Sequence, residues 1–481
     1  MLKNHLLIVL FILLYFFIVA SKLIIKPLPF YDWDEAIYAQ VGKETIARKS
    51  LVPLWQGNYW LDKPPLVLLV YGVINKFLSF ATPEILDRIF NLLLIISAYI
   101  LIYIFYLKVV KDKLLATLTV ILSSFTSLFL QRAHQINFDV FLLLGWLGYL
   151  LFFDNFLISL FFLSLSVLSK SLIGFYPVIM MGFYYLFLFW KKEIKVKQLK
   201  TFLSKIIVQV AILSLWYLVM FIIFSQNFWQ QHIIESHFRR VTASIESHFG
   251  KRTFYIDLLF EQFSFYTWLS ILGFFYFIHQ FLKKKLTRNQ FFYGVYLFPW
   301  FIFLNLTKTK IFWYIYPSIP VFAFFITCSF WFLKDRKIIF YLLFGLILFH
   351  SVRQAIVQQK FLTSQYSSFT DYYFLAKRAK KHCLKLYYLV DKNSRQAMTT
   401  LEKMGLTITT TKWWGSHPSV VYYFGKEVNF IYDKTKFIRT IPTLDNNNCL
   451  AVENEDLATD FPIDYLQKIK QFSSLTLFKK I

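Results

Sequence analysis

The sequence predicts an all-α polytopic membrane protein with about eleven transmembrane helices, additional juxtamembrane helices and a small C-terminal α/β domain. The 481 residues are 57% hydrophobic and 21% aromatic, and only 16% are charged, whereas about a quarter of a soluble protein is charged. Several almost uncharged runs reach the ~20 residues that a helix needs to cross a bilayer. After residue 351 the apolar runs shorten to strand length. We therefore expect a transmembrane domain over 1–351 and an extracytoplasmic α/β domain over 352–481.

The net charge of +25 does not indicate a nucleic-acid partner, because much of the Lys and Arg lies in short clusters between apolar segments. Cytoplasmic loops of membrane proteins have this pattern. The first apolar run, about 6–25, is longer than the apolar region of a signal peptide. It predicts a retained first span with a cytoplasmic N-terminus.

One apolar segment, 65–80, decides the topology. If it crossed the membrane, the cluster of Lys108, Lys111 and Lys113 would lie outside, so we expect a juxtamembrane helix along the outer interface. With this choice the strongly basic short loops share the cytoplasmic side. The expected spans are 6–25, 89–107, 114–130, 140–153, 156–168, 172–190, 203–224, 255–281, 290–306, 312–333 and 338–351.

The C-terminal region alternates short apolar runs with polar segments, as an α/β domain does. Strands are expected at 384–390, 420–424, 428–431 and 449–452, and a helix at 394–405, with Ser394 as N-cap and Gly405 as its stop. Cys383 and Cys449 either form a disulfide or remain buried thiols. Neither they nor Cys328, which lies in an apolar segment, has the spacing of a metal site.

With this topology, the outer loops gather acids and bases. Ionisable groups at a membrane edge are costly unless paired or hydrated, so their clustering indicates a functional site. The members are Asp32, Asp34, Glu35, Asp62, Lys63, Asp87, Arg88, Arg132, His134, Asp139, Glu235, His237, Arg239, Arg240, His248, Lys308 and Lys310.

Transfer of a sugar from a lipid phosphate needs both kinds of group. Cations stabilise the charge on the leaving phosphate, and a carboxylate accepts the proton of the incoming hydroxyl or stabilises an oxocarbenium-like centre. A transporter or lipid flippase is the alternative, but it would place charges in mid-span cavities. Here mid-span charges are few, with Asp257 and Glu261 as the main exceptions. A membrane anchor for a C-terminal binding domain would leave the polar first loop unexplained.

Three motifs occur in a fixed order: DEAIYA at 34–39, WLDKPPL at 60–66, and DR at 87–88, which opens a span. They resemble the polyprenyl-phosphate-sugar transferases of the GT-C superfamily, in particular the protein O-mannosyltransferases and the aminoarabinose transferases of lipid A. The resemblance is clearest over the first 140 residues. It continues through Glu235 with Arg239 and through the Lys310, Tyr314 and Pro317 pattern.

The resemblance implies roles for eleven residues. Asp34 is the expected catalytic carboxylate, with Asp139 as a second acid near the sugar. The expected donor-phosphate ligands are Lys63, Arg239, Arg240, Lys310 and Tyr314, and the expected acceptor or supporting residues are Glu35, Asp62, Arg88 and Glu235. Two alternatives stay open: Asp34 as N-cap of a helix at 35–48, and Lys63 as an interfacial lysine whose ammonium reaches the headgroups. Lys308 is equally compatible with an interfacial anchor.

The resemblance further implies an inverting transfer from a polyprenyl-phosphate sugar to a hydroxyl or phosphate group of a glycolipid, glycan or protein. It places this reaction on the extracytoplasmic side of a prokaryotic cytoplasmic membrane. Two departures leave the sugar and the acceptor open. The second outer loop reads QRAHQ at 131–135 where such families are often Arg-rich, and Asp62 stands where aminoarabinose transferases carry Glu.

Asp32 and Asp34 also resemble the Asp-x-Asp motif that binds a metal in nucleotide-sugar enzymes. A monophosphate held by several cations needs a metal less than a diphosphate does. We therefore expect no obligatory cofactor, with a divalent metal as the alternative. Glu235, His237 and His248 leave a zinc site open.

Overall fold

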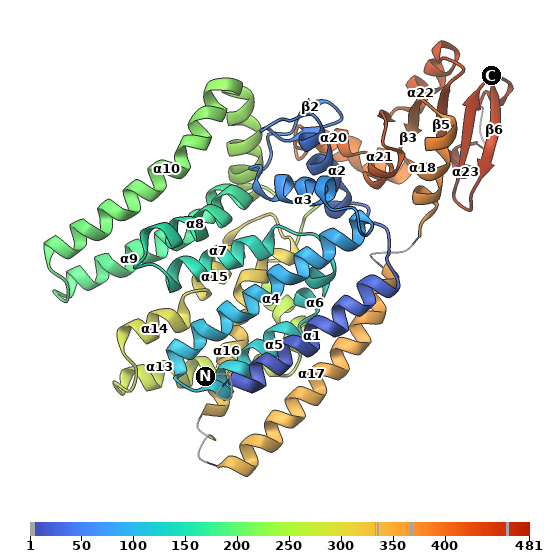
Figure 1. The fold of residues 1–481 in the computed structure, drawn as a ribbon. Coiled ribbons are helices and arrows are strands. Elements are labelled where there is room, and N and C mark those ends of the chain that lie inside the picture. Colours follow the sequence, from blue (N-terminus) through green and yellow to red (C-terminus); the bar gives the residue numbers. More distant parts are fainter. Residues whose placement is uncertain (1–4, 332, 334–335, 366–368, 458–460) are drawn as a thin grey trace.

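The computed structural model describes residues 5–331, 333, 336–365, 369–457 and 461–481. Figure 1 shows a body of long helices and, at one end of it, a C-terminal domain that contains a sheet. The body consists of helices α1 (Leu6–Ile25), α2 (Asp34–Ala47), α3 (Leu66–Phe77), α4 (Pro83–Val110), α5 (Lys113–Ser124), α6 (Ser127–His134), α7 (Asp139–Leu151), α8 (Phe156–Lys170), α9 (Tyr176–Trp190), α10 (Val196–Phe228), α11 (Arg240–Thr242), α12 (Phe254–Phe263), α13 (Tyr266–Leu282), α14 (Arg288–Val295), α15 (Phe298–Leu306), α16 (Ile319–Trp331) and α17 (Lys337–Gln365). Between them lie the 3₁₀ segments η2 (Ser171–Phe175) and η4 (Phe312–Ser318), the π-helix η3 (Trp229–Arg239) and a hairpin of β1 (Leu54–Trp55) and β2 (Asn58–Tyr59).

Each predicted span coincides with one helix or with two consecutive helical segments, but the predicted number of spans is not confirmed. By length and apolar composition, five helical segments of the described residues are suited to cross a membrane, or up to seven if each of two bent pairs is one span. The number is lower partly because Phe156–Trp190 counts as one segment and because Asp139–Leu151 is shorter than a full crossing.

Two predicted spans are broken. The span expected at 114–130 bends by 71° between α5 and α6, and the span expected at 255–281 bends by 106° between α12 and α13. In the first, the Thr126 side chain accepts a hydrogen bond from the Phe129 amide and begins a new helix. In the second, Ser264 ends α12 with a positive φ of 53°. A hydropathy pattern does not register such polar breaks.

The segment expected to lie along the interface, 65–80, forms α3, which has 12 residues and is too short to cross a bilayer. It packs against α2 where two glycines meet: a Cβ on Gly72 would lie 2.3 Å from the carbonyl oxygen of Gly42. This close approach joins α2, which begins at Asp34, to α3, which follows the motif at 60–66.

The C-terminal domain has a five-stranded sheet in the order β4-β3-β5-β7-β6. Strand β3 is parallel to β4 and β5, whereas β7 is antiparallel to β5 and β6. The strands are β3 (Lys385–Leu389), β4 (Val428–Ile431), β5 (Asn448–Glu453), β6 (Leu466–Gln471) and β7 (Leu475–Lys480), and the helices are α18 (Asp371–His382), α19 (Lys392–Lys403), α20 (Thr411–Trp414), α21 (Ser419–Phe424), α22 (Lys434–Thr440) and α23 (Asn454–Leu457), with short 3₁₀ turns at η5 (Ile441–Thr443) and η6 (Ile463–Tyr465).

Three of the four predicted strands are confirmed, and the one at 420–424 is wrong. That segment is helix α21, which packs between α18 and α2 and ends at Gly425 in the left-handed conformation. Its β-branched and aromatic residues favour a strand, so tertiary packing overrides local propensity. The predicted helix is α19, but Asp391 caps it by accepting a hydrogen bond from the Ser394 amide.

The structure decides between the two interpretations of the C-terminal cysteines. Cys383 and Cys449 form a disulfide that joins the segment before β3 to β5. Cys328 is a buried free thiol in α16.

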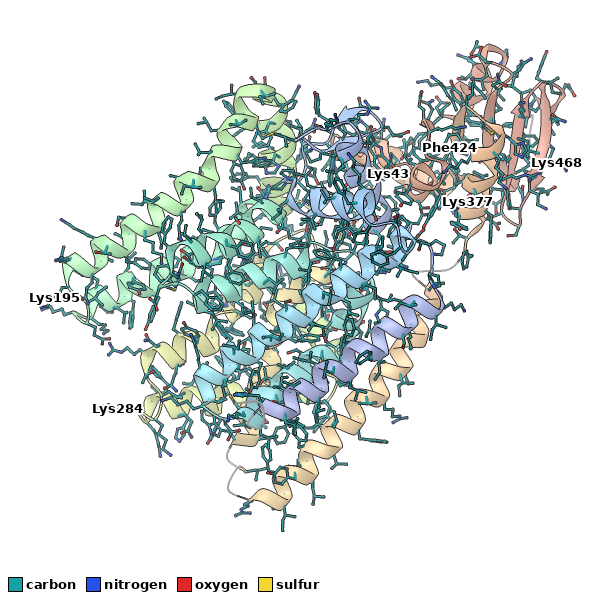
Figure 2. The ribbon with its side chains drawn as sticks, in the orientation of Figure 1. Lys43, Lys195, Lys284, Lys377, Phe424 and Lys468 are labelled. Carbon is teal, nitrogen blue, oxygen red and sulfur yellow. A yellow bond between two sulfur atoms is a disulfide. The ribbon has the colours of Figure 1, made fainter. Side chains whose placement is uncertain are left out.

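The basic loops lie far from the C-terminal domain. In Figure 2, Lys195 and Lys284 lie at the end of the helical body away from that domain, whereas Lys43 lies near it and Lys377 belongs to it. That the basic loops face the cytoplasm and the C-terminal domain lies outside stays a prediction.

The contact between α2 and α3 yields a stability prediction. We expect Gly72→Ala to lower the midpoint of thermal unfolding in detergent, because overpacking costs about 1–3 kcal/mol and the new methyl group would meet the backbone of Gly42. Gly182→Ala is the matched control, since a Cβ there meets nothing within 4 Å. Equal midpoints for the two variants would contradict the packing described.

Candidate active site

A cavity of about 1010 Å³ lies where the helical body meets the C-terminal domain. Its wall is formed by the start of α2, the loop before α3, the starts of α7 and α9, η3, the segment 307–314 and, from the C-terminal domain, α19 and residues 408–416. Most of its lining is apolar, with a small set of ionisable and polar groups, as in many ligand sites. The ionisable members are Asp34, Glu35, Asp62, Lys63, Arg132, Asp139, Lys170, His237, Arg240, Glu246 and His248, with the hydroxyl groups of Tyr38 and Tyr314.

Asp34 is the first residue of α2 and lines this cavity. The N-cap is Trp33, and no side chain caps the helix, so the interpretation of Asp34 as an N-cap is wrong. Its carboxylate has no hydrogen-bond or ion-pair partner among the described residues. Burial raises the pKa of Asp34, and the positive charges of Arg132 and Lys170 offset only part of that rise. Asp34 is therefore an unpaired carboxylate that faces an open space.

The neighbouring Glu35 is fully engaged. Arg88 donates to both of its oxygens, from Nε to Oε1 at 3.0 Å and from Nη2 to Oε2 at 2.6 Å. The amides of Tyr31 and Ile136 donate to the same carboxylate at 2.8 and 2.9 Å. Glu35 therefore holds the first outer loop and the second outer loop together, as a supporting residue, and Arg88 lies behind the cavity wall.

Asp62 and Lys63 form an ion pair of 3.1 Å in the cavity. Burial alone would raise the pKa of the Asp62 carboxyl, but Lys63, Arg240 and the Ser236 hydroxyl hold it well below its ordinary value. Because Lys63 lines the cavity and pairs with an acid, the alternative of a lysine reaching for lipid headgroups is not supported.

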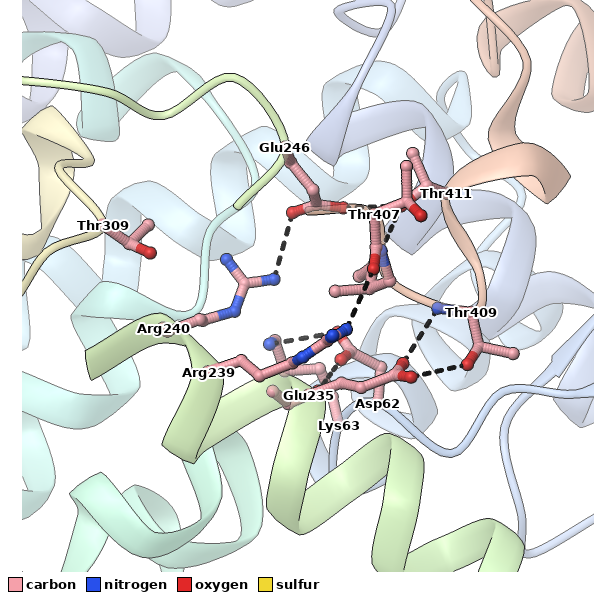
Figure 3. Close-up of polar contacts among 12 residues, drawn as sticks. Asp62, Lys63, Glu235, Arg239, Arg240, Glu246, Thr309, Thr407, Thr409 and Thr411 are labelled. Atoms are coloured by element: carbon pink, nitrogen blue, oxygen red, sulfur yellow. Dashed lines mark hydrogen bonds and ion pairs between the residues drawn. The ribbon is translucent and has the colours of Figure 1, made fainter. Parts of the chain in front are cut away.

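Arg240 lies on the same wall. Its Nη2 is 3.2 Å from Glu246 Oε2, and its Nη1 is 3.5 Å from the Tyr314 hydroxyl. Lys63, Arg240 and Tyr314, which the sequence assigned to the donor phosphate, therefore meet in one cavity with Asp34 (Figure 3 shows Lys63 and Arg240).

Asp139, the predicted second acid, also lines the cavity but is held by two cations. Lys170 donates to its Oδ1, and Arg132 Nε lies 3.6 Å from its Oδ2. Lys170 was not predicted, and its only signal in the sequence is its position at the end of an apolar span. Arg132 is one of the charged residues of the outer loops, but the sequence predicted no catalytic or binding role for it.

Three other predicted residues do not line the cavity. Arg239 donates to the carbonyl oxygens of Thr407 and Gly405, at 3.2 and 3.1 Å. Lys310 donates to the carbonyl oxygens of Leu304 and Asn305 at the end of α15. Glu235 accepts hydrogen bonds from the Thr409 amide and hydroxyl, both at 2.8 Å.

The structure does not bring Arg239 and Lys310 to this cavity, so their positions do not support the prediction that they bind the donor phosphate. Arg239 adjoins Arg240 in the chain but points to the C-terminal domain. The ammonium of Lys310 satisfies carbonyl groups at a helix C-terminus, where a cation is favourable.

The C-terminal domain is fastened to the body through residues 405–419, which we call the docking segment. Asp32 binds His417 and accepts from the Ser419 amide at 2.9 Å. Glu246 accepts from the Thr411 hydroxyl at 3.2 Å. Figure 3 shows Glu235, Arg239 and Glu246 reaching this segment from the helical body. The docking segment and α19 complete the cavity wall with Ser394, Met398, Leu401, Ile408 and Trp414.

The π-helix η3 ties two parts of the site together. His232 is buried, with Nε2 2.6 Å from the Ser171 hydroxyl and Nδ1 2.8 Å from the Leu61 carbonyl oxygen. It thereby links the residue after Lys170 to the residue before Asp62. π-Helical turns are rare and occur frequently at functional sites.

No group of three or more metal-ligating side chains suited to hold an ion occurs in the part of the chain that the structure describes. Asp32 does not line the cavity with Asp34, because His417 and the Ser419 amide bind its carboxylate. Glu235, from the possible zinc set, is bound by Thr409 instead.

No protein-family model matches the chain. An uncharacterized protein of Aquifex aeolicus (strain VF5) is 26% identical over 335 residues, which covers 67% of this chain and 63% of that protein. The match therefore spans less than two thirds of the length of this relative.

The comparison with solved structures identifies the fold. ArnT from Cupriavidus metallidurans bound to undecaprenyl phosphate superposes with a TM-score of 0.64 at 12% identity, covering 100% of this chain and 98% of ArnT. Its apo state gives 0.67 at 12% identity, covering 99% and 97%. The apo oligosaccharyltransferase of Archaeoglobus fulgidus gives 0.56 at 11% identity, covering 92% of this chain and 69% of that protein. This chain therefore shares the fold of these proteins, and the predicted helical membrane fold with a small C-terminal domain is confirmed.

The docking segment yields a prediction about local stability. We expect Glu235→Ala to speed hydrogen exchange at the Thr409 amide and its neighbours, because this amide loses its buried acceptor. The measurement is hydrogen-exchange mass spectrometry of peptides that cover 405–411. Glu261→Ala, at an exposed acid of α12, should leave these peptides unchanged. Identical exchange in both variants would show that Glu235 does not fasten the segment.

Proposed function

We propose that this chain, which has a GT-C fold, is a membrane glycosyltransferase that moves a sugar from a polyprenyl-phosphate donor to an acceptor. The observation that carries the proposal is an unpaired carboxylate, Asp34, in one cavity with the cations Lys63 and Arg240. The fold of an ArnT that binds undecaprenyl phosphate supports the choice of donor. The reaction would take place on the extracytoplasmic side of a prokaryotic cytoplasmic membrane, since the cavity adjoins the C-terminal domain and lies away from the basic loops.

Lys63, Arg240 and Tyr314 are the proposed ligands of the donor phosphate. A guanidinium and an ammonium on one wall supply charge-assisted hydrogen bonds to an anion that must leave with its charge. The acids that now pair with them, Asp62 and Glu246, keep these cations in place before the donor arrives. Arg239, Lys310, Glu235 and Arg88 are proposed to support the site from behind its wall, and Glu35 supports it from within the wall.

An apolar part of the cavity wall is the proposed place where the polyprenyl chain leaves the cavity. This part includes Ile173 of η2, Ile179 of α9, and Phe303 and Leu304 of α15. Ile179 is 53% exposed and Phe303 is 40% exposed, so both reach the outer surface of the helical body. A lipid lying between α9 and α15 would place its phosphate inside the cavity and its tail in the bilayer.

Asp34 is the proposed base. It would take the proton of the acceptor hydroxyl while the oxygen attacks the anomeric carbon from the face opposite the phosphate, so that the configuration inverts. A raised pKa makes this carboxylate a better proton acceptor. Asp139 is held by Lys170 and Arg132, so its proposed role is to position these cations. Because four cations line the cavity, we propose that no metal is obligatory.

We expect Asp34→Asn to abolish transfer and Lys63→Met to lower it by about 100-fold or more, the scale of losing one group that stabilises developing charge. The readout is mass spectrometry of the envelope glycans and glycolipids of cells that lack the gene and carry each variant. Lys308→Met is the control, because that side chain is exposed and does not line the cavity. Restored modification in the Asp34→Asn strain would remove Asp34 from the mechanism.

The raised pKa of Asp34 predicts a pH dependence. A base must be deprotonated, so kcat/KM should fall as the pH decreases through the pKa of Asp34 in the folded protein. Burial raises that pKa, so the acid limb should lie above the ordinary aspartate value of about 3.9. A pH profile of the purified enzyme tests this. Activity that persists unchanged down to the ordinary value would contradict the assignment.

A further inference from the structure

The cavity holds a second pair of cations, Arg132 and Lys170, and this pair differs from Arg240 in its contacts. The Lys170 ammonium lies over the face of the Tyr314 ring, 5.4 Å from its centre. Arg240 instead contacts the hydroxyl of this tyrosine. The two pairs also have separate acids, since Asp139 binds Arg132 and Lys170 whereas Glu246 binds Arg240.

Arg132 has two buried donors without a hydrogen-bond partner, more than any other described residue that lines the cavity. Its side chain is 4% exposed, and its Nε and Nη2 are buried without a hydrogen-bond partner. None of its donors is hydrogen-bonded to protein in the described part of the chain. The guanidinium lies over the Trp313 ring, 4.8 Å from its centre. Unsatisfied buried donors are costly and call for an explanation.

The charges of this cluster do not balance either. Two cations share the single carboxylate of Asp139, and Asp34, the next acid on the wall, is paired with neither of them. A hydroxyl group would give Arg132 an acceptor but no counter-charge. A carboxylate or phosphate would supply both, and the fork of a guanidinium matches either anion.

We propose that Arg132, Lys170 and Asp139 form a second anion subsite, which takes a carboxylate or phosphate of the transferred sugar or of the acceptor. The inference rests on the proposed function, in which Lys63 and Arg240 hold the lipid phosphate. Asp139 positions the two cations, and Arg132 and Lys170 contact the anion. The substrate that approaches Asp34 therefore carries a negative group of its own, in addition to the phosphate of the donor.

The test uses the full-length protein in detergent and three soluble probes: glucuronate, glucose 1-phosphate and glucose. Tryptophan fluorescence reports binding, because Trp313 lies against Arg132, and Trp313→Phe identifies its share of the signal. We expect an acidic probe to bind at least tenfold more tightly than glucose. Added salt should weaken this binding. Binding of glucuronate alone identifies a carboxylate, and binding of glucose 1-phosphate alone identifies a phosphate.

Variants assign the binding to the subsite. Arg132→Met and Lys170→Met should each lower the affinity for the acidic probe at least tenfold. Lys63→Met and the exposed control Lys308→Met should leave this affinity unchanged. Thermal unfolding verifies that the variants are folded, and Arg132→Lys replaces Arg132→Met if the latter is not. Equal binding of glucose and the acidic probes, or their retention in both Arg132 and Lys170 variants, overturns the proposal.

The same proteins separate this proposal from the proposed function. Native mass spectrometry with undecaprenyl phosphate should show the opposite pattern, with binding lost in Lys63→Met and retained in Lys170→Met. If the lipid does not bind while the acidic probe binds through Arg132, the donor assignment fails and the anion subsite stands. If the lipid binds as expected and neither acidic probe binds, the subsite alone is refuted.

Discussion

The arrangement of the site depends on the buried pair of Arg88 and Glu35. Replacing such a pair with apolar residues is often neutral for stability, but removing one partner costs about 3–5 kcal/mol, so its main contribution is fixed geometry. Here the two forked hydrogen bonds leave the Glu35 carboxylate no freedom to turn. Because α2 begins one residue earlier, its first carboxylate, Asp34, is directed into the cavity with no partner. Arg88 also donates hydrogen bonds to the carbonyl oxygens of Leu28 and Pro29. Glu35 also accepts hydrogen bonds from the amides of Tyr31 and Ile136.

The ionisable residues around the cavity perform two separate tasks. One set faces the cavity and the other fastens the C-terminal domain, through Asp32, Glu235 and Arg239. Glu246 belongs to both, since it binds Arg240 inside the cavity and Thr411 of the docking segment. The density of charge in the outer loops therefore reflects an interface between domains as well as a site. An anion that drew Arg240 away from Glu246 would also change the contact with the docking segment.

The sequence predicted most of the ionisable residues that line the cavity, but it missed Lys170 and the contacts that fasten the C-terminal domain. Asp34, Asp62 and Lys63 follow from short motifs, and the helices follow from hydropathy. The contact of Glu235 with Thr409 joins residues 174 positions apart, and no local pattern indicates it. Arg239 and Arg240 are adjacent and equally basic, so only the geometry of η3 shows which one faces the cavity. For the same reason the position of Lys170 at the end of an apolar span did not show that it faces the cavity.

Two aspartates in one cavity acquire different chemistry from their surroundings. Asp139 lies between two cations, so its charge is compensated before any substrate arrives. Asp34 is buried beside the same cluster without a bond to it, and burial makes its anionic form costly. A carboxylate that is costly to ionise accepts a proton readily. The proposed division of roles follows from these surroundings: Asp34, which no described side chain binds, is the group proposed to take the proton, and Asp139 is bound by Arg132 and Lys170 and is proposed to position them.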